Sequence, residues 1–213
     1  MCVGYNTVMK PLALTAKVKL IVSDSDMQVL LDTVRTYTKA CNVVSEWIFH
    51  SRELEHRIVH DALYLKLRDE LGLKSQMAES VFRTVIARYR TILTNQKEWI
   101  RPVFHAYEYD LVWNRDYSLL KNGMFSLNSL KGRIKAGFHI TGMEHYFEEP
   151  WKFGTAKLVH RHGKLFLHIP VTRKMEKIDT NTISTVVGID RGIRFLTAGY
   201  DSNGNTIFIS GSV

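Results

Sequence analysis

The chain has 213 residues, of which 45% are hydrophobic and 23% are charged. This length and composition predict one or two globular domains and exclude disordered, collagen-like and coiled-coil proteins. Two cysteines, Cys2 and Cys41, cannot form a disulfide framework or a cysteine-rich zinc site, so we expect a reducing, bacterial-type cytoplasm. No apolar run is long enough to span a membrane, and charges interrupt the region that a signal peptide would need.

The charge balance points to a polyanionic partner. The chain carries 29 lysines and arginines against 21 aspartates and glutamates, a net charge of +8. The stretches Tyr117–Met143 and Trp151–Met175 contain no acidic residue, and aromatic residues alternate with their cations. This pattern is typical of surfaces that follow phosphates and stack bases, although solvated strand faces over an aromatic core would share it. The candidate nucleic-acid ligands here are Lys121, Lys131, Arg133, Lys135, Lys157, Arg161 and Lys164.

The chain is predicted to begin with a strand and a long helix. Polar and apolar residues alternate over Thr15–Ser23, which indicates a half-buried strand. Capping oxygens follow from Ser23 to Asp26. Apolar residues then recur at three- and four-residue spacing as far as Ile48, which predicts an amphipathic helix.

Two more helices are predicted next. One passes through Ala62–Leu71 and ends at Gly72, and the other extends from Ser75 to about Gln96. Residues 24–101 are therefore expected to form a helical bundle.

The third predicted helix carries a row of cations. Arg83, Arg90 and Lys97 are seven residues apart, so each lies only about 20° from the last around the helix axis. Arg88 adds a further positive charge. These four residues are candidate ligands for nucleic-acid phosphates, with an ordinary solvated helix face as the alternative.

After Pro102 the pattern changes to short strand-like runs separated by glycine-containing turns. The clearest is Ala156–Val171, where two runs flank His162-Gly163 and predict a hairpin. Several such strands predict a small barrel or sandwich, which the first strand would complete. We therefore expect an α+β fold, in which residues 1–23 and 102–180 form a small β-barrel and residues 24–101 are inserted into it.

Two histidines of this hairpin, His160 and His162, are expected on one strand face. A metal could use that geometry, but no third ligand is apparent in the sequence. Surface histidines beside a phosphate track are the favoured interpretation.

The last segment carries the most specific chemistry. Asp190 ends an apolar strand-like run that begins at Thr185, and the turn sequence Asp201–Gly204 then joins two further runs. A strand with a terminal Asp followed by a hairpin is typical of the opening meander of an RNase H-like nuclease. Hydrolysis with two divalent ions needs carboxylates on rigid backbone, so Asp190 is the candidate catalytic residue and metal ligand. The alternatives are an Asp that caps a turn and the first phosphate loop of an actin-like ATPase.

Taken together, these segments resemble the transposon-encoded TnpB (OrfB-type) family of RNA-guided DNA endonucleases, which is related to the compact type V CRISPR effectors. The order and spacing of the segments are more specific than any one of them. The resemblance rests on Ala40–Val44, Gly72–Ala78, Phe153–Leu158, Gly163–Val171 and Val187–Arg194.

The resemblance implies a role for each region. The β region would be a wedge domain, the helices a recognition lobe, and residues 181–213 the start of a RuvC domain. Asp190 would be its first carboxylate. The intact nuclease would use Mg²⁺ or Mn²⁺, and its partners would be a guide RNA and a target DNA, with no membrane.

One departure from the family matters. The family completes its RuvC site with a later Glu and Asp and carries a Cys-rich zinc module, none of which occurs up to Val213. The chain is therefore expected to be a fragment or a shortened member, and to cleave no DNA by itself. Asp201 is interpreted as a turn residue. A nuclease-inactive RNA- or DNA-binding protein is the main alternative, and an actin-like ATPase, whose further nucleotide motifs are absent, is a minor one.

Overall fold

The computed structural model describes residues 11–96, 98–105, 108–175, 184–191 and 196–210. The chain forms two compact units: one spans Lys10–Lys174, and the described residues after Lys174 belong to the second. Within the described ranges, no helix has the length and apolar character needed to cross a bilayer.

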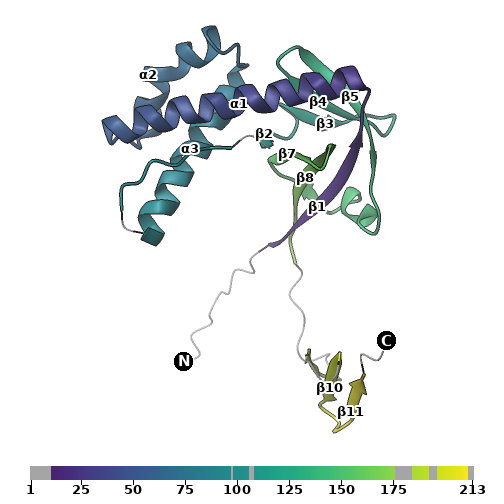
Figure 1. Ribbon diagram of the computed structural model, residues 1–213. Helices are drawn as coiled ribbons and strands as arrows, with labels where there is room; N and C mark the ends of the chain where they lie inside the picture. The colour runs from purple at the N-terminus through teal and green to yellow at the C-terminus, as the bar shows by residue number, and fades with distance from the viewer. Residues whose placement is uncertain (1–10, 97, 106–107, 176–183, 192–195, 211–213) are drawn as a thin grey trace, which may run out of the picture. The chain divides into compact units, whose positions relative to one another are not determined.

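The first unit begins with strand β1 (Leu12–Ile21) and three helices, α1 (Asp24–Ser51), α2 (His56–Asp69) and α3 (Ser75–Gln96) (Figure 1). Ser23 caps α1, because its Oγ accepts a hydrogen bond from the Asp26 backbone N–H at 3.1 Å. Arg52, with a left-handed φ of 63°, ends the same helix. The predicted strand, cap and three helices are confirmed.

Both α1 and α2 pack against α3. Their apolar faces are buried at the three- and four-residue spacing seen in the sequence. Gly72, with φ +64°, reverses the chain after α2, and the neighbouring Leu73 N–H bonds back to the Leu67 carbonyl. The buried side chains of these faces include Val44, Ile48, Leu63, Leu67, Val81 and Val85.

Seven further strands join β1 in one antiparallel sheet. The order is β2-β7-β8-β1-β5-β4-β3, with β6 pairing β8, and a short 3₁₀ helix, η1 (Glu144–Phe147), precedes β6. The strands are β2 (Glu108–Leu111), β3 (Tyr117–Leu119), β4 (Phe125–Ser129), β5 (Gly132–His139), β6 (Lys152–Phe153), β7 (Ala156–Arg161) and β8 (Lys164–Arg173).

This sheet is a nearly closed barrel. Its two edge strands, β2 and β3, are consecutive in the chain and are joined by the short segment Val112–Asp116. The Tyr109 hydroxyl on β2 also donates to the Asn128 carbonyl on β4, at 2.8 Å. The predicted α+β fold and barrel are confirmed, as is the role of the first strand, since β1 lies between β5 and β8.

One hydrophobic core joins the barrel to the helices. The inward residues of the barrel and the buried faces of the helices form a single cluster of buried side chains. α1 packs against β2 and β4, so the helices lie on the barrel rather than on a separate body.

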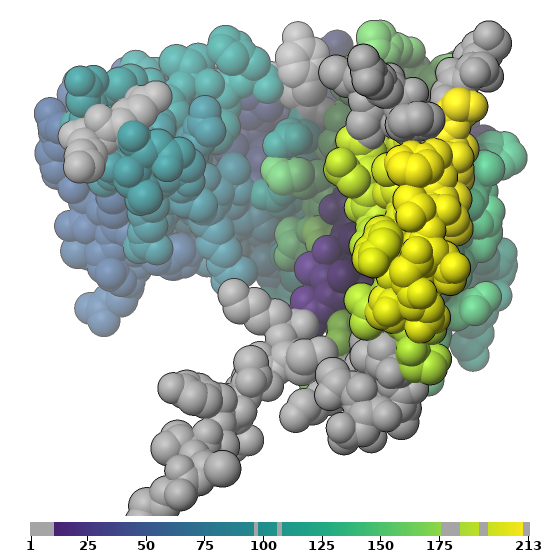
Figure 2. All heavy atoms as spheres, turned by 90° about the horizontal axis from the view of Figure 1, so that it is seen from below, coloured from purple at the N-terminus to yellow at the C-terminus, as the bar shows by residue number. Residues whose placement is uncertain are grey.

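The second unit contains a three-stranded antiparallel meander, β9 (Val187–Asp190), β10 (Thr197–Asp201) and β11 (Thr206–Ile209). β10 pairs with β11, and Figure 2 shows their yellow-green and yellow atoms next to each other. The predicted meander is therefore present, whereas its assignment to a RuvC domain stays a prediction. Its large apolar side chains are exposed: Val187, Ile189, Tyr200, Ile207, Phe208 and Ile209.

Candidate nucleic-acid interface

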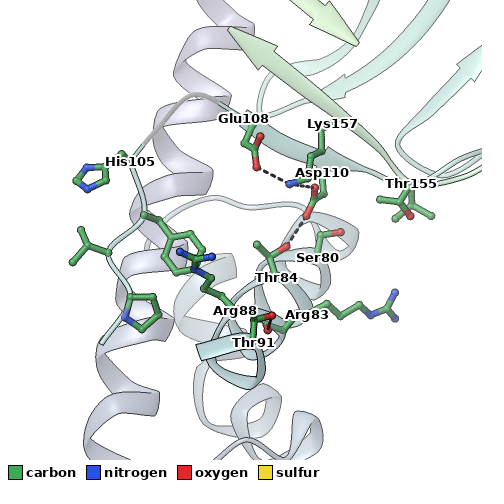
Figure 3. Close-up of a pocket in the computed structure, with 15 residues that line it drawn as sticks. Ser80, Arg83, Thr84, Arg88, Thr91, His105, Glu108, Asp110, Thr155 and Lys157 are labelled. Atoms are coloured by element: carbon green, nitrogen blue, oxygen red, sulfur yellow. Dashed lines mark hydrogen bonds and ion pairs between the residues drawn. The ribbon is translucent and has the colours of Figure 1, made fainter. Parts of the chain in front are cut away.

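A cleft of about 770 Å³ lies between α3 and the outward faces of β2 and β7 (Figure 3). Two of the predicted cations, Arg83 and Arg88, line it from α3 and point in opposite directions. Neither guanidinium forms a hydrogen bond or ion pair with any described residue. These two charges are therefore available to an anion at the rim of the cleft.

The floor of the cleft is held together by ion pairs. The Lys157 ammonium lies 2.6 Å from a Glu108 carboxylate oxygen and 3.3 Å from an Asp110 oxygen. Desolvation acts to lower the pKa of Lys157, but the two carboxylates outweigh it and raise that pKa above its ordinary value. Lys157 is thus charged but compensated, because one ammonium faces two carboxylates.

Asp110 also anchors the helices. Its second oxygen accepts hydrogen bonds from the Thr84 hydroxyl of α3 at 2.5 Å and from the Tyr37 hydroxyl of α1 at 3.1 Å. Burial and the nearby Asp110 charge raise the pKa of Tyr37, so its hydroxyl remains a donor. This polar node fixes the position of α3, and with it the two arginines, relative to the barrel.

Of the predicted row of cations on α3, Arg83 and Arg90 are both exposed. The Arg90 guanidinium turns toward the loop before α2, where it donates to the Leu54 carbonyl at 3.4 Å. Lys97 lies outside the described residues.

Five barrel cations predicted from the sequence are exposed and have no partner among the described side chains. They lie at turns or on the outward side of a strand. Lys121 belongs to the β3–β4 turn, Lys131 to the β4–β5 turn, Lys135 to β5, and Arg161 and Lys164 to the β7–β8 hairpin.

Arg133 differs from these five cations. Its guanidinium donates to the Ser126 hydroxyl at 2.8 Å, to the Ser126 carbonyl at 3.2 Å and to the Arg115 carbonyl at 3.0 Å. The side chain therefore ties β5 to β4 and to the turn before β3. Its positive charge remains, but its donors are largely committed.

The hairpin histidines depart from the expected pattern. The strand ends at Arg161, and His162-Gly163 form a two-residue turn in which both φ angles are positive, 49° and 69°. The alternation that would place His160 and His162 on one strand face therefore stops before His162. Among the described residues, no group of three or more His, Cys, Asp or Glu side chains is placed to hold a metal ion.

Sequence reasoning missed two cations, Lys17 and Lys19, which are exposed on β1. They occupy the polar positions of the alternating run that predicted this strand, and that alternation was the available signal. In register, Lys17 lies opposite His168 and Lys19 opposite Phe166. Desolvation and the Lys17 charge lower the pKa of His168.

Asp190 lies at the end of β9, exposed and opposite Ala198 of β10. The other carboxylate in the described part of the meander, Asp201, accepts hydrogen bonds from the Asn203 and Asn205 backbone N–H groups at 2.9 and 2.8 Å. The Asn205 side chain and these backbone donors lower the pKa of Asp201. Asp201 is the last residue of β10, and its carboxylate stabilises the turn that follows, in line with its interpretation as a turn residue. The carboxylates in the described part of the meander do not fit a two-metal site.

No protein-family model matches the sequence. A similar arrangement occurs in the cryo-EM structure of a Cas12f1–sgRNA–target DNA complex, with a TM-score of 0.49 and 8% identity, over 95% of this chain and 66% of that one. A second similar structure is a CRISPR-Cas12f ternary complex, with a TM-score of 0.44 and 13% identity, over 89% of this chain and 52% of that one. This chain thus spans less than two thirds of the length of either.

Proposed function

We propose that this chain is the guide-RNA- and target-DNA-binding portion of an RNA-guided DNA endonuclease of the TnpB type. Residues 1–23 and 102–180 would form its wedge, residues 24–101 its recognition lobe and residues 181–213 the start of its RuvC domain. RNA and DNA are also the ligands in the Cas12f1 complex. The segments that resemble the TnpB family, in their order along the chain, support this assignment.

The observation that carries the binding proposal is the distribution of free positive charge. Arg83 and Arg88 at the cleft and five exposed cations of the barrel have no compensating carboxylate among the described residues. A surface of this kind attracts the phosphates of a nucleic acid whatever its base sequence. A protein whose guide RNA reads the target by base pairing needs such sequence-tolerant contacts.

A salt titration tests this proposal. The complete chain should bind a structured RNA, with log affinity falling linearly against log salt. Charge reversal in Arg83→Glu/Arg88→Glu, or in Arg161→Glu/Lys164→Glu, should flatten that slope by about 0.7 to 0.9 for each lost phosphate contact. The matched control is Lys39→Glu on the exposed side of α1, which should leave the slope unchanged.

The proposal fails if the folded chain binds RNA with an affinity that neither double reversal alters. Tight ATP binding without a salt-dependent RNA affinity would instead support the actin-like ATPase alternative.

For catalysis, we propose that Asp190 supplies one metal-binding carboxylate of the complete nuclease. Two divalent ions about 4 Å apart need several carboxylates, so this chain alone should not cut DNA in Mg²⁺ or Mn²⁺. In a longer protein that does cut, Asp190→Ala should abolish cleavage and leave RNA affinity nearly unchanged. Metal-dependent cleavage by this chain, lost in its Asp190→Ala variant, would contradict the assignment.

A nuclease-inactive nucleic-acid-binding protein remains the second candidate. It is favoured by the single free carboxylate in the described part of the meander, since Asp201 is committed to its own turn. This candidate shares the binding predictions and differs in one outcome, because no longer form of the protein would cleave DNA.

A further inference from the structure

Two rows of side chains cross the outward face of the barrel in register. One contains Asp110, Lys157, His168 and Lys17, on β2, β7, β8 and β1. The other contains Glu108, Val159, Phe166, Lys19 and His139, on the same four strands and β5. Neighbouring strands lie about 4.8 Å apart, so each row brings residues distant in sequence into direct contact range.

The two rows have a defined electrostatic polarity. Both carboxylates, Glu108 and Asp110, lie at the β2 end and are matched there by Lys157. Toward β1 and β5 the rows contain only cations, histidines and Phe166. An anion would therefore be attracted to the β1 end, where Lys17 and Lys19 are exposed and have no carboxylate partner among the described residues.

Phe166 is unusual on such a surface. It is half-buried on the outward side of β8, whereas its neighbours Leu165 and Leu167 point into the barrel and are fully buried. It takes no part in the hydrophobic core and makes no ring contact with another described aromatic. An aromatic ring outside the core cluster and on the outward face, opposite Lys19, has the properties of a platform on which a base can stack.

We propose that the outward face of β8 and β1 binds an unpaired single strand of nucleic acid, with a base stacked on Phe166 and phosphates held by Lys17 and Lys19. Two residues along a strand are about 7 Å apart, which is close to the spacing of successive phosphates in an extended single strand. Stacking on a ring face needs an unpaired base, so a duplex would not use Phe166. This inference rests on the proposed nucleic-acid-binding function. It adds that the ligand of this barrel face is an unpaired single strand and not a duplex.

The test compares single strands with a duplex, using the complete chain. Fluorescence anisotropy would follow oligo(U) RNA, oligo(dT) DNA and a duplex, each about 12 nucleotides long. Phe166→Leu should weaken binding of both single strands at least about fivefold and leave the duplex unaffected. Lys17→Gln/Lys19→Gln should flatten the single-strand salt slope by about 1.4.

Two controls and one positive variant complete the design. Lys39→Gln on α1 and Tyr200→Leu on the meander remove an exposed cation and an exposed aromatic elsewhere, and neither should change binding. Phe166→Trp should keep the affinity and add tryptophan emission that a single strand quenches. This variant and the lysine pair still test the inference if Phe166→Leu destabilises the barrel.

Each outcome is decisive. Unchanged single-strand binding by Phe166→Leu, equal losses on single strand and duplex, or no quenching in Phe166→Trp overturns the inference. If binding still depends on Arg83 and Arg88, the proposed function survives that result. If the wild-type chain binds no nucleic acid, both proposals fail.

Discussion

The unit Lys10–Lys174 and the C-terminal meander are built from similar strands but differ in burial. In the first unit, strand residues such as Val18 and Leu167 are fully buried in a core shared with three helices. In the meander, Ile189 and Ile207 are 69% and 59% exposed although their strands, β9 and β11, each pair with β10. Backbone pairing alone thus forms a sheet without forming a core, and a second layer is needed to cover its apolar faces.

This difference separates the two proposed activities. The surfaces proposed to bind nucleic acid belong to the unit that completes its own core. The proposed catalytic residue, Asp190, belongs to strands that need a further layer to be stable. Binding and cleavage should therefore be separable by mutation.

The largest difference between the two regions should appear when the chain is divided and each part is tested for folding by itself. A shortened chain of residues 10–174 should unfold cooperatively and bind RNA within about threefold of the complete chain, because its core and cations are retained. A peptide of residues 184–213 should lack strand structure, since isolated small sheets are marginal in water. Circular dichroism and anisotropy would measure both. A stably folded peptide would show that the two regions do not differ as argued.

Matched truncations of strand side chains should sharpen the comparison. Leu167→Ala creates a cavity in the barrel and should lower the free energy of unfolding of the first unit by about 2–5 kcal/mol. Ile189→Ala removes similar atoms from an exposed site and should change that free energy by less than about 0.5 kcal/mol. Urea unfolding followed by circular dichroism measures both values. Similar losses from the two variants would mean that Ile189 is part of the same cooperative core.

Mutation of Asp110 tests whether its polar contacts hold the helices to the barrel. Asp110→Ala leaves the Tyr37 hydroxyl, the Thr84 hydroxyl and Lys157 without their shared acceptor. We expect the free energy of unfolding to fall by about 2–3 kcal/mol. Tyr37→Phe removes one donor only and should cost about 1 kcal/mol. Hydrogen exchange should show α3 opening before the barrel in Asp110→Ala, and wild-type protection of α3 in that variant would contradict this role.

Local pattern was sufficient to predict most of the fold. Apolar spacing gave the helices, alternation gave β1, and His162-Gly163 gave the hairpin, because each is decided by neighbouring residues. The role of β1 as the strand that completes the barrel was also predicted. Helices follow β1 in the sequence, so its only possible partners were the later strands of the barrel, and it pairs with β5 and β8.

The site was harder to predict because charge compensation is a tertiary property. Lys157 lies in a stretch with no acid, yet Glu108 and Asp110 reach it across the β2–β7 pair. Arg133 is similarly committed to backbone and hydroxyl acceptors that only the paired strands bring together. Conversely, Lys17 and Lys19 were overlooked because the strand that contains them was interpreted only for its apolar face.

The smallest predicted effect concerns His168 of the first unit, whose protonated form is destabilised in the folded protein. Its pKa is lowered by desolvation and by Lys17, so the native state binds this proton more weakly than the unfolded state. As pH falls below about 6.5, the unfolded state gains the proton first, and the stability of wild type relative to His168→Gln should decrease.

A bound single strand places phosphates beside Lys17 and should reduce that decrease. Thermal unfolding of both chains between about pH 7.5 and 5, with and without oligo(U), measures the difference. If the two chains lose stability in parallel, the lowered pKa of His168 is refuted; if oligo(U) does not alter the difference, the phosphates do not lie beside this row.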